Sequence, residues 1–376
     1  MAIDLHEITE GNTVFKAPIQ DETCEFPPGS APVFYNTRME FNRDMTVLLL
    51  AVLRPSEYLD SMAATGVRGL RVANETHIPV VINDFNRQAT EIIRENAETF
   101  DEQIEVTCSD ANALMCTRRF DTVDLDPFGT PVPFLDAASR SAKRYLFVTA
   151  TDTAPLCGAH FKAGLRRYFA TPLNTAEYHA ETGLRMMMGT MARELVKYDR
   201  GMEPVLSFAS AHFYRSHIRI LPKVPAADHT VEQMGFVHQC PHCLYRSEER
   251  GSLLPHEEIC PRCGARTIPI GPMWMGPLSD KTVVAGMQEM LPSMRFGTAA
   301  KMEKFLAMLH DEPDTCFFYD YHAICRSLKV SPPAMDTFLA AVEAKGYTAT
   351  RTHFSGTGIK TTAPLDVLES CLQTNV

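Results

Sequence analysis

The residues best suited to chemistry stand at the end of an apolar segment, in the run Asp124-Leu125-Asp126-Pro127-Phe128-Gly129. Residues two apart in a strand point to the same side, so Asp124 and Asp126 are expected on one face. Pro127 restricts the backbone and offers no N–H donor. A carboxylate and a proline carbonyl can accept both N–H groups of a planar amine, while Phe128 covers its ring. The alternative interpretation is a capped turn that begins a helix.

Three other segments place small or acidic residues after predicted strands. Small residues in 63–66 would let a ligand approach the backbone, although the pattern Ala64-x-Gly66-x-x-Gly69 also resembles a degenerate dinucleotide fingerprint. Asp84 would bind ribose hydroxyls in either an NAD or an S-adenosylmethionine site. Asp110 could accept a hydrogen bond from an adenine amino group, or it is a helix N-cap.

These residues need a scaffold that brings strand ends together, and the hydrophobic pattern predicts one. Because strands and helices alternate, we expect a doubly wound parallel sheet with helices on both faces and a ligand site at the carboxyl ends of its strands. The predicted strands are 57–60, 79–84, 104–108, 120–126 and 144–151, and the predicted helices are 45–53, a helix from Arg68, 87–100, 111–115 and 134–141.

The composition excludes several classes of protein. Of 376 residues 45% are hydrophobic and 22% are charged, which excludes wholesale disorder and predicts two or three domains. The longest apolar run, 47–53, is too short to span a membrane. The net charge of −10 argues against binding nucleic acid by bulk charge. Residues 137–223 nevertheless carry 13 basic and 6 acidic groups, either as a phosphate-binding face or as solvated helix faces.

The eleven cysteines fall into two groups. Seven, including Cys24, are scattered, which is typical of buried thiols in a reducing cytoplasm. The other four form two Cys-x-x-Cys pairs separated by 16 residues, a spacing that predicts a closed, structural zinc site rather than a redox dithiol pair. His238, His242 and His256 lie nearby, but none is expected as a ligand. The predicted ligands are Cys240, Cys243, Cys260 and Cys263.

The carboxyl-terminal part resembles a winged helix, a common nucleic-acid-binding module. We expect a helix that opens between Pro313 and Asp320, and a further helix that begins at 331–333. A two-stranded wing would then turn around 355–358. On this wing Arg351, His353 and Lys360 are either phosphate contacts or ordinary surface charges.

Asp126-Pro127-Phe128-Gly129 resembles the Asp-Pro-Pro-Tyr type motif of S-adenosylmethionine-dependent amino methyltransferases, with Phe128 in place of the second proline. In this variant form, Asp-Leu-Asp-Pro-Phe-Gly, it resembles the archaeal type of the tRNA guanine-26 N2-dimethyltransferase family. Further segments from about residue 30 to 365 resemble the same family: 32–36, 42–44, 64–69, 83–84, 110–112, 149–152 and 346–361.

The resemblance implies a role for each matching residue. Arg43 and Arg68 would bind the cofactor near its methionine carboxylate. Asp84 would hold the ribose, and Asp110 with the backbone of Ala111 would hold the adenine. In the catalytic site, Asp126 would orient the guanine N2 amine, and Phe34 and Phe128 would pack on the target base. The alternative interpretation of Phe34 is an ordinary aromatic residue of the core.

Together these inferences predict an α/β protein: a Rossmann-like class I methyltransferase sheet plus a smaller α+β domain. The first domain would span 1–222 with an N-terminal extension. The second, tRNA-binding domain would span 223–376, with a zinc knuckle at about 236–266 and a winged-helix-like part at about 301–365. The expected partner is tRNA, with no membrane, no evident obligate protein partner, and a cytoplasmic location.

Three other functions compete with this interpretation. The same pocket residues would also suit an amino methyltransferase that acts on DNA or another RNA. A non-catalytic zinc and winged-helix adaptor would have no use for acids at three strand ends. An NAD enzyme would leave residues 126–129 unexplained, and the sequence offers no evident hydride-transfer partner.

Overall fold

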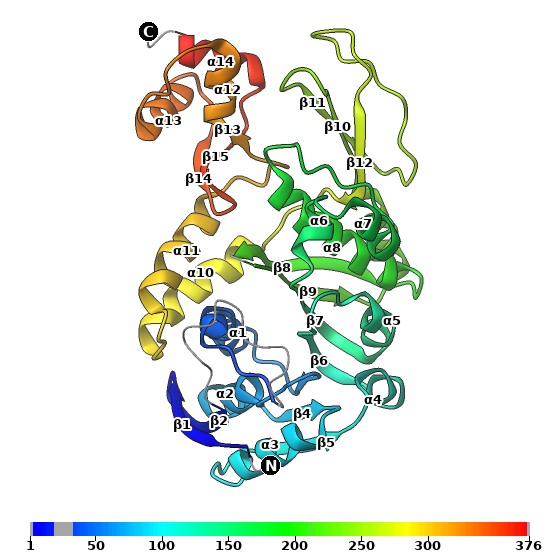
Figure 1. Ribbon diagram of the computed structural model, residues 1–376, viewed down its shortest axis with the longest axis vertical. Coiled ribbons are helices and arrows are strands. Elements are labelled where there is room, and N and C mark those ends of the chain that lie inside the picture. Colours follow the sequence, from blue (N-terminus) through cyan, green and yellow to red (C-terminus); the bar gives the residue numbers. More distant parts are fainter. Residues whose placement is uncertain (1–2, 19–32, 211, 374–376) are drawn as a thin grey trace.

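The computed structural model describes residues 3–18, 33–210 and 212–373, and the segment 19–32, with Cys24 and Pro32, lies outside this described part. In Figure 1 the large sheet lies in the lower half of the elongated molecule, and two three-stranded sheets lie above it. None of the described helices is long and apolar enough to cross a membrane.

The large sheet has seven strands in the order β5-β4-β3-β6-β7-β9-β8. The first five strands are parallel, as the sequence predicts, while β9 runs antiparallel to both β7 and β8. The carboxyl ends of the parallel strands therefore meet at one edge. The strands are β3 (Tyr58–Asp60), β4 (Val80–Asp84), β5 (Ile104–Cys108), β6 (Phe120–Leu125), β7 (Ala142–Ala150), β8 (Gly201–Ser210) and β9 (Phe213–Leu221).

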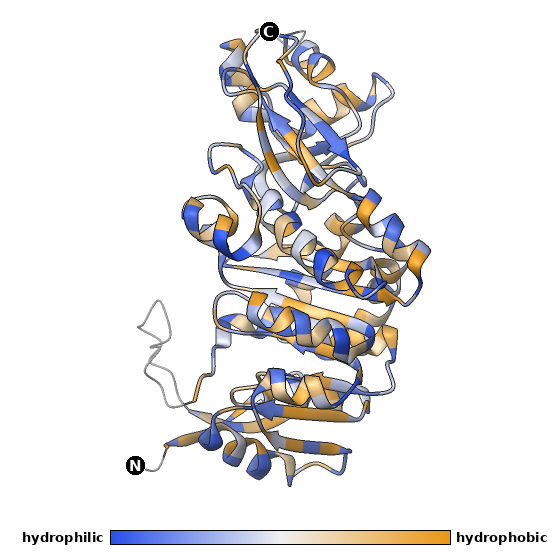
Figure 2. Ribbon diagram, turned by 90° about the vertical axis from the view of Figure 1, so that its right-hand side faces the viewer, coloured by the Kyte–Doolittle hydropathy of each residue, from blue (hydrophilic) through white to orange (hydrophobic). Residues whose placement is uncertain are grey.

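Helices cover both faces of this sheet because its strands are apolar on both sides. Leu59 and Val123 join one core, with α4, α5 and α8, whereas Tyr58 and Val80 join the other, with α1 and α2. Figure 2 shows strands that are mostly hydrophobic beside helices that carry both kinds of residue. The helices are α1 (Glu40–Leu53), α2 (Val67–Thr76), α3 (Arg87–Ala97), α4 (Ala111–Thr117), α5 (Val132–Ser141), α6 (Thr153–Leu156), α7 (Phe161–Tyr168) and α8 (His179–Val196).

Helix α1 begins at Glu40, five residues before the predicted start at Met45. Its first turns are polar and nevertheless buried, because an N-terminal hairpin supplies a carboxylate for Arg43, and Arg71 of α2 pairs with Asp44. The hairpin consists of β1 (Leu5–Glu10) and β2 (Thr13–Pro18). Arg43 of α1 pairs with Glu10 of this hairpin.

The rest of the chain extends from this sheet. A three-stranded sheet follows α9, and its strand β12 packs on α8, while α10 returns to α1. A last unit packs α12, α13 and α14 around strands β13–β15, with its own core including Phe338 and Ile359. These elements are α9 (Val224–Glu232), β10 (Met234–Gln239), β11 (Arg246–Arg250), β12 (Ile268–Trp274), α10 (Lys281–Met290), α11 (Ala299–Asp311), β13 (Tyr319–Asp320), α12 (Tyr321–Leu328), α13 (Met335–Glu343), β14 (Ala349–Thr352), β15 (Ser355–Thr361) and α14 (Leu365–Gln373).

Three predicted boundaries in the last unit are wrong, and the first is the helix expected from 331–333, which begins only at Met335. The helix expected to open between Pro313 and Asp320 begins only at Tyr321, where the Asp320 carboxylate caps the N–H groups of residues 322 and 323. The hairpin turns at 353–354 rather than at 355–358, because Thr352 already pairs with Ser355.

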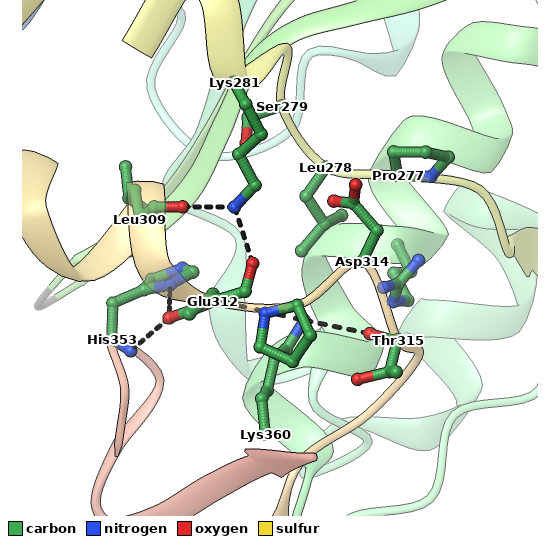
Figure 3. A pocket seen from close by; sticks show the side chains of 12 residues that line it. Pro277, Leu278, Ser279, Lys281, Leu309, Glu312, Asp314, Thr315, His353 and Lys360 are labelled. Atoms are coloured by element: carbon green, nitrogen blue, oxygen red, sulfur yellow. Dashed lines mark hydrogen bonds and ion pairs between the residues drawn. The ribbon is translucent and has the colours of Figure 1, made fainter. Parts of the chain in front are cut away.

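A buried polar junction ties this hairpin to α10 and α11, and Figure 3 shows its side chains converging. The Glu312 carboxylate accepts hydrogen bonds from His353, from Nδ1 and from the backbone N–H, both at 2.7 Å. Lys360 donates to the Thr315 carbonyl at 3.1 Å and forms an ion pair with Glu181 at 3.2 Å. The remaining space is about 10 Å³, room for about one water molecule.

The junction overturns two predicted phosphate contacts. The side chains of His353 and Lys360 are only 1% and 3% exposed, so they are neither phosphate contacts nor surface charges. Arg351 does lie at the surface, where it pairs with Asp336.

Candidate active site

A cavity of about 470 Å³ opens at the carboxyl ends of β3, β4 and β6. This size lies within the range of small-molecule sites. Six of the eight residues predicted for cofactor and substrate line it: Phe34, Arg43, Arg68, Asp84, Asp126 and Phe128. Asp110 and Ala111 are not among the lining residues.

The wall after β3 is a short loop that Asp84 holds in place. One carboxylate oxygen of Asp84 accepts the Ala64 N–H at 2.7 Å, and the other accepts the Asn86 N–H at 2.8 Å. Burial raises the pKa of Asp84, and these backbone donors oppose the rise. Gly66 has a φ of 76°, and a Cβ there would lie 2.8 Å from Ile93. A larger residue would therefore displace this loop.

A second wall is the turn after β6, the neighbour of β3 in the sheet. The backbone of Gly129 is fixed by Thr151, whose hydroxyl accepts the Gly129 N–H at 2.8 Å and whose N–H donates to the Gly129 carbonyl at 3.0 Å. Gly129 needs its φ of 78° to make this turn. The ring of Phe128 is 76% exposed and meets Phe34 edge to face, with centroids 4.7 Å apart. An aromatic pair therefore stands at the rim of the cavity.

A buried charge network lies beneath the turn. Asp124 receives two hydrogen bonds from Arg215 of β9, at 2.7 and 2.6 Å, and one from the Tyr58 hydroxyl at 2.5 Å. Burial alone would raise the pKa of Asp124, but Arg215 and Arg68 outweigh it and hold the pKa well below its ordinary value. Arg68 also contacts the carboxylate of Asp126 directly. The network thus positions Asp126, the carboxylate that directly follows β6 and lines the cavity.

Asp60, at the end of β3, lines the cavity, although no role was predicted for it from the sequence. Its side chain accepts the Gly69 N–H at 3.0 Å. Burial raises its pKa to about 7, with Arg68 opposing the rise and the neighbouring Asp124 and Asp126 adding to it. Its position at a strand end is the same signal that identified Asp84 and Asp126.

Arg43 lies on the side of the cavity nearest the N-terminal hairpin. It donates from Nε to Glu10 at 2.8 Å and from Nη2 to the Asn36 carbonyl at 3.0 Å. Burial raises the pKa of Glu10, but Arg43 and Arg71 prevail and lower it overall. The sequence offered no sign that residue 10 would reach this site.

Asp110 has the local role that its position allows: its carboxylate accepts the Ala113 N–H at 2.9 Å and caps α4. Ala111, the first residue of α4, is buried in the core. Phe85, which sequence reasoning passed over, lines the cavity and is 78% exposed.

Far from this cavity, the four predicted metal ligands come together. The sulfur atoms of the two Cys-x-x-Cys pairs lie within 4.8 Å of one another. Cys240 lies 3.4 Å from Cys263, and Cys243 lies 3.6 Å from Cys260. Four thiolates at this spacing suit a tetrahedral ion.

The mixed seven-stranded sheet and its acid-lined cavity define a Rossmann-like methyltransferase. The solved structure of Trm1 from Pyrococcus horikoshii in complex with S-adenosyl-L-methionine matches this chain with a TM-score of 0.89 and 38% identity, covering 98% of this chain and 100% of that one.

The family follows from the sequence matches. The family model described as N2,N2-dimethylguanosine tRNA methyltransferase matches residues 11–373, and this chain belongs to that family. Two archaeal relatives carry the name tRNA (guanine(26)-N(2))-dimethyltransferase. The protein of Methanocorpusculum labreanum is 67% identical over 98% of this chain and 97% of its own length. The protein of Methanoculleus marisnigri is 56% identical over 98% of each.

Proposed function

We propose that the protein transfers methyl groups from S-adenosyl-L-methionine to the exocyclic N2 of guanine 26 in tRNA, giving N2-methyl- and then N2,N2-dimethylguanosine. The observation that carries this proposal is the Asp126 carboxylate in the cavity beside the exposed ring of Phe128, in a chain of this family. An acceptor beside an aromatic face is what a planar amine requires.

The cavity fits the proposed cofactor in size and in donor and acceptor groups. S-adenosyl-L-methionine, when bound, supplies a methyl group on a positively charged sulfur. Asp84 would accept hydrogen bonds from the ribose hydroxyls, and Arg68 and Arg43 would face the methionine carboxylate. Asp110 and Ala111 are the proposed adenine contacts. The Asp110 carboxylate would have to accept a hydrogen bond from the adenine while it still caps α4.

The protein's contribution to the reaction is alignment and charge. Asp126 would accept an N–H of the guanine amine, which raises electron density on nitrogen and stabilises the positive charge that develops during attack. Phe34 and Phe128 would hold the base in the plane of transfer. After one transfer the nitrogen gives up one proton, which Asp126 would accept and release to water, and it keeps one hydrogen, so Asp126 can orient it again. Unstacking the base from folded RNA costs a few kcal/mol, which stacking on these rings offsets.

We place part of the tRNA contact on α7. Its exposed residues include Lys162 and Arg166, both from the basic segment. Tyr168, at the end of α7, donates to Thr130 at 3.0 Å, so the helix is anchored beside the catalytic turn. Changing Lys162 and Arg166 together to Glu should weaken tRNA binding and its salt dependence. Lys143→Glu, at the opposite end of β7, is the matched control.

The parts beyond the sheet are proposed as the second domain, 223–376. Four-thiolate geometry supports a structural Zn²⁺ in a knuckle at about 236–266. Helices α12 and α13 followed by the β14–β15 hairpin support a winged-helix-like part at about 301–365. The boundary at 222 follows the end of β9, while α10 reaches back to α1. None of the ten cysteines among the described residues forms a disulfide, which supports a cytoplasmic location.

The test is a transfer assay with a labelled methyl donor and an unmodified tRNA transcript, followed by nucleoside mass spectrometry. We expect N2,N2-dimethylguanosine at position 26, and no product from a transcript with adenine at that position. Transfer to DNA or ribosomal RNA in preference to tRNA would contradict the proposed substrate. Binding of nucleic acid without transfer would favour a non-catalytic adaptor.

A further inference from the structure

A second group of potential metal ligands lies beside the four cysteines and uses none of them. It consists of His238 on β10 together with His256 and Glu258 from the segment that follows β11. One ligand atom from each residue lies within 4.8 Å of the other two. The three residues therefore converge although 18 to 20 positions separate His238 from the others.

The strongest observation is the ring of His238, whose side chain is 1% exposed. Its Nε2 lies 2.8 Å from the Glu249 carboxylate, so the N–H of the ring belongs there. The other nitrogen, Nδ1, has no hydrogen-bond partner among the described residues. The Glu258 carboxylate lies 4.0 Å from it. A lone pair and a carboxylate are both acceptors, so a cation between them would satisfy both.

Neighbouring groups orient this set as outer partners orient metal ligands. The Glu249 carboxylate also pairs with His256. Nδ1 of His256 lies 2.9 Å from the same carboxylate oxygen that pairs with His238. The two imidazole rings lie 4.6 Å apart. Glu258 is fixed by the Tyr245 hydroxyl at 3.0 Å and by the Ser247 hydroxyl. One carboxylate thus fixes two rings, and two hydroxyls fix the remaining ligand.

We infer that His238, His256 and Glu258 form a second metal site, for a divalent transition ion such as Zn²⁺, separate from the four-thiolate site. Two imidazoles and one carboxylate are donors that Zn²⁺ accepts, and water would complete a tetrahedron. The ligands hold β10 and the segment 251–259 together. That segment carries two exposed leucines, Leu253 and Leu254.

Metal stoichiometry tests the inference on the full chain. Protein equilibrated with excess Zn²⁺ under reducing conditions and then desalted should hold two ions per chain by elemental mass spectrometry. His256→Ala and Glu258→Gln should each hold one. His242→Ala is the matched control, because this histidine is exposed and stands between two of the cysteines, and it should hold two.

Zinc-edge X-ray absorption distinguishes the two sites without relying on any variant. The wild-type protein should give mixed sulfur and nitrogen or oxygen coordination, and Glu258→Gln should give sulfur alone. One ion per wild-type chain with four sulfur ligands would overturn the inference. Two ions per chain in both His256→Ala and Glu258→Gln would overturn it as well.

Discussion

Asp60 makes the stability of this protein depend on pH in a way that one substitution should remove. Its pKa rises from an ordinary 3.8 to about 7 because the carboxyl is buried, with two carboxylates nearby. At a pH between these two pKa values, the folded chain therefore keeps a proton on Asp60 that the unfolded chain has released. This contribution to stability is complete below about pH 3.8 and is lost as the pH rises through about 7.

The size of the effect follows from the two pKa values. Between about pH 5 and about pH 8 the folded state should lose about 2 to 3 kcal/mol through this group alone. Asp60→Asn keeps an oxygen for the Gly69 N–H and has no proton to lose. Relative to wild type, the variant should therefore gain about 2 to 3 kcal/mol of stability over this interval.

Urea unfolding of both proteins at the two pH values, without cofactor, measures this difference. Other titrating groups are common to both chains and largely cancel in the comparison. A stability difference between variant and wild type that does not change with pH would refute the proposed state of Asp60.

Three further predictions concern the network, the junction and the rim. Arg215→Met leaves Asp124 buried without its main partner and should lower the free energy of unfolding by about 3 kcal/mol, measured by urea unfolding against Arg219→Met. Glu312, with a pKa lowered to about 2, stabilises the fold above about pH 4.5 and loses this effect as the pH falls through about 2. Glu312→Gln should thus destabilise the protein by about 1 to 3 kcal/mol at neutral pH, and in acid its stability should approach that of wild type. Thermal unfolding of both proteins across this pH range measures the difference. Phe128→Ala should lower kcat/KM for tRNA by about 10- to 100-fold with unchanged cofactor affinity, since the exposed ring would stack on the base and makes none of the proposed cofactor contacts.

The sequence predicted the parallel part of the sheet and several cavity residues because both depend on local patterns. Apolar runs and helical periods repeat within about 30 residues, and parallel strands must end at a common edge. The sequence alone could therefore predict that Asp84 and Asp126 lie at the same edge of the sheet. The resemblance assigned Phe34 and Phe128 to the target base, and the structure brings their rings together, a contact that the sequence did not predict.

The missed features depend on contacts between distant segments. Arg215 meets Asp124 across 91 positions, and Glu10 reaches Arg43 from a separate hairpin. His353 and Lys360 look like surface residues in sequence, and only the packing of the hairpin onto Glu312 buries them. Polar residues give no sign of burial until their partners are known.

The central claim is that Asp126 orients the amine that receives the methyl group. The most direct measurement compares methyl transfer to the tRNA transcript by wild type and Asp126→Asn, with cofactor affinity determined by calorimetry on the same samples. Asp136→Asn, on the exposed surface of α5, is the matched control. We expect Asp126→Asn to lose at least about 100-fold in single-turnover rate while it still binds cofactor and tRNA. A rate within a few-fold of wild type would contradict this role for Asp126.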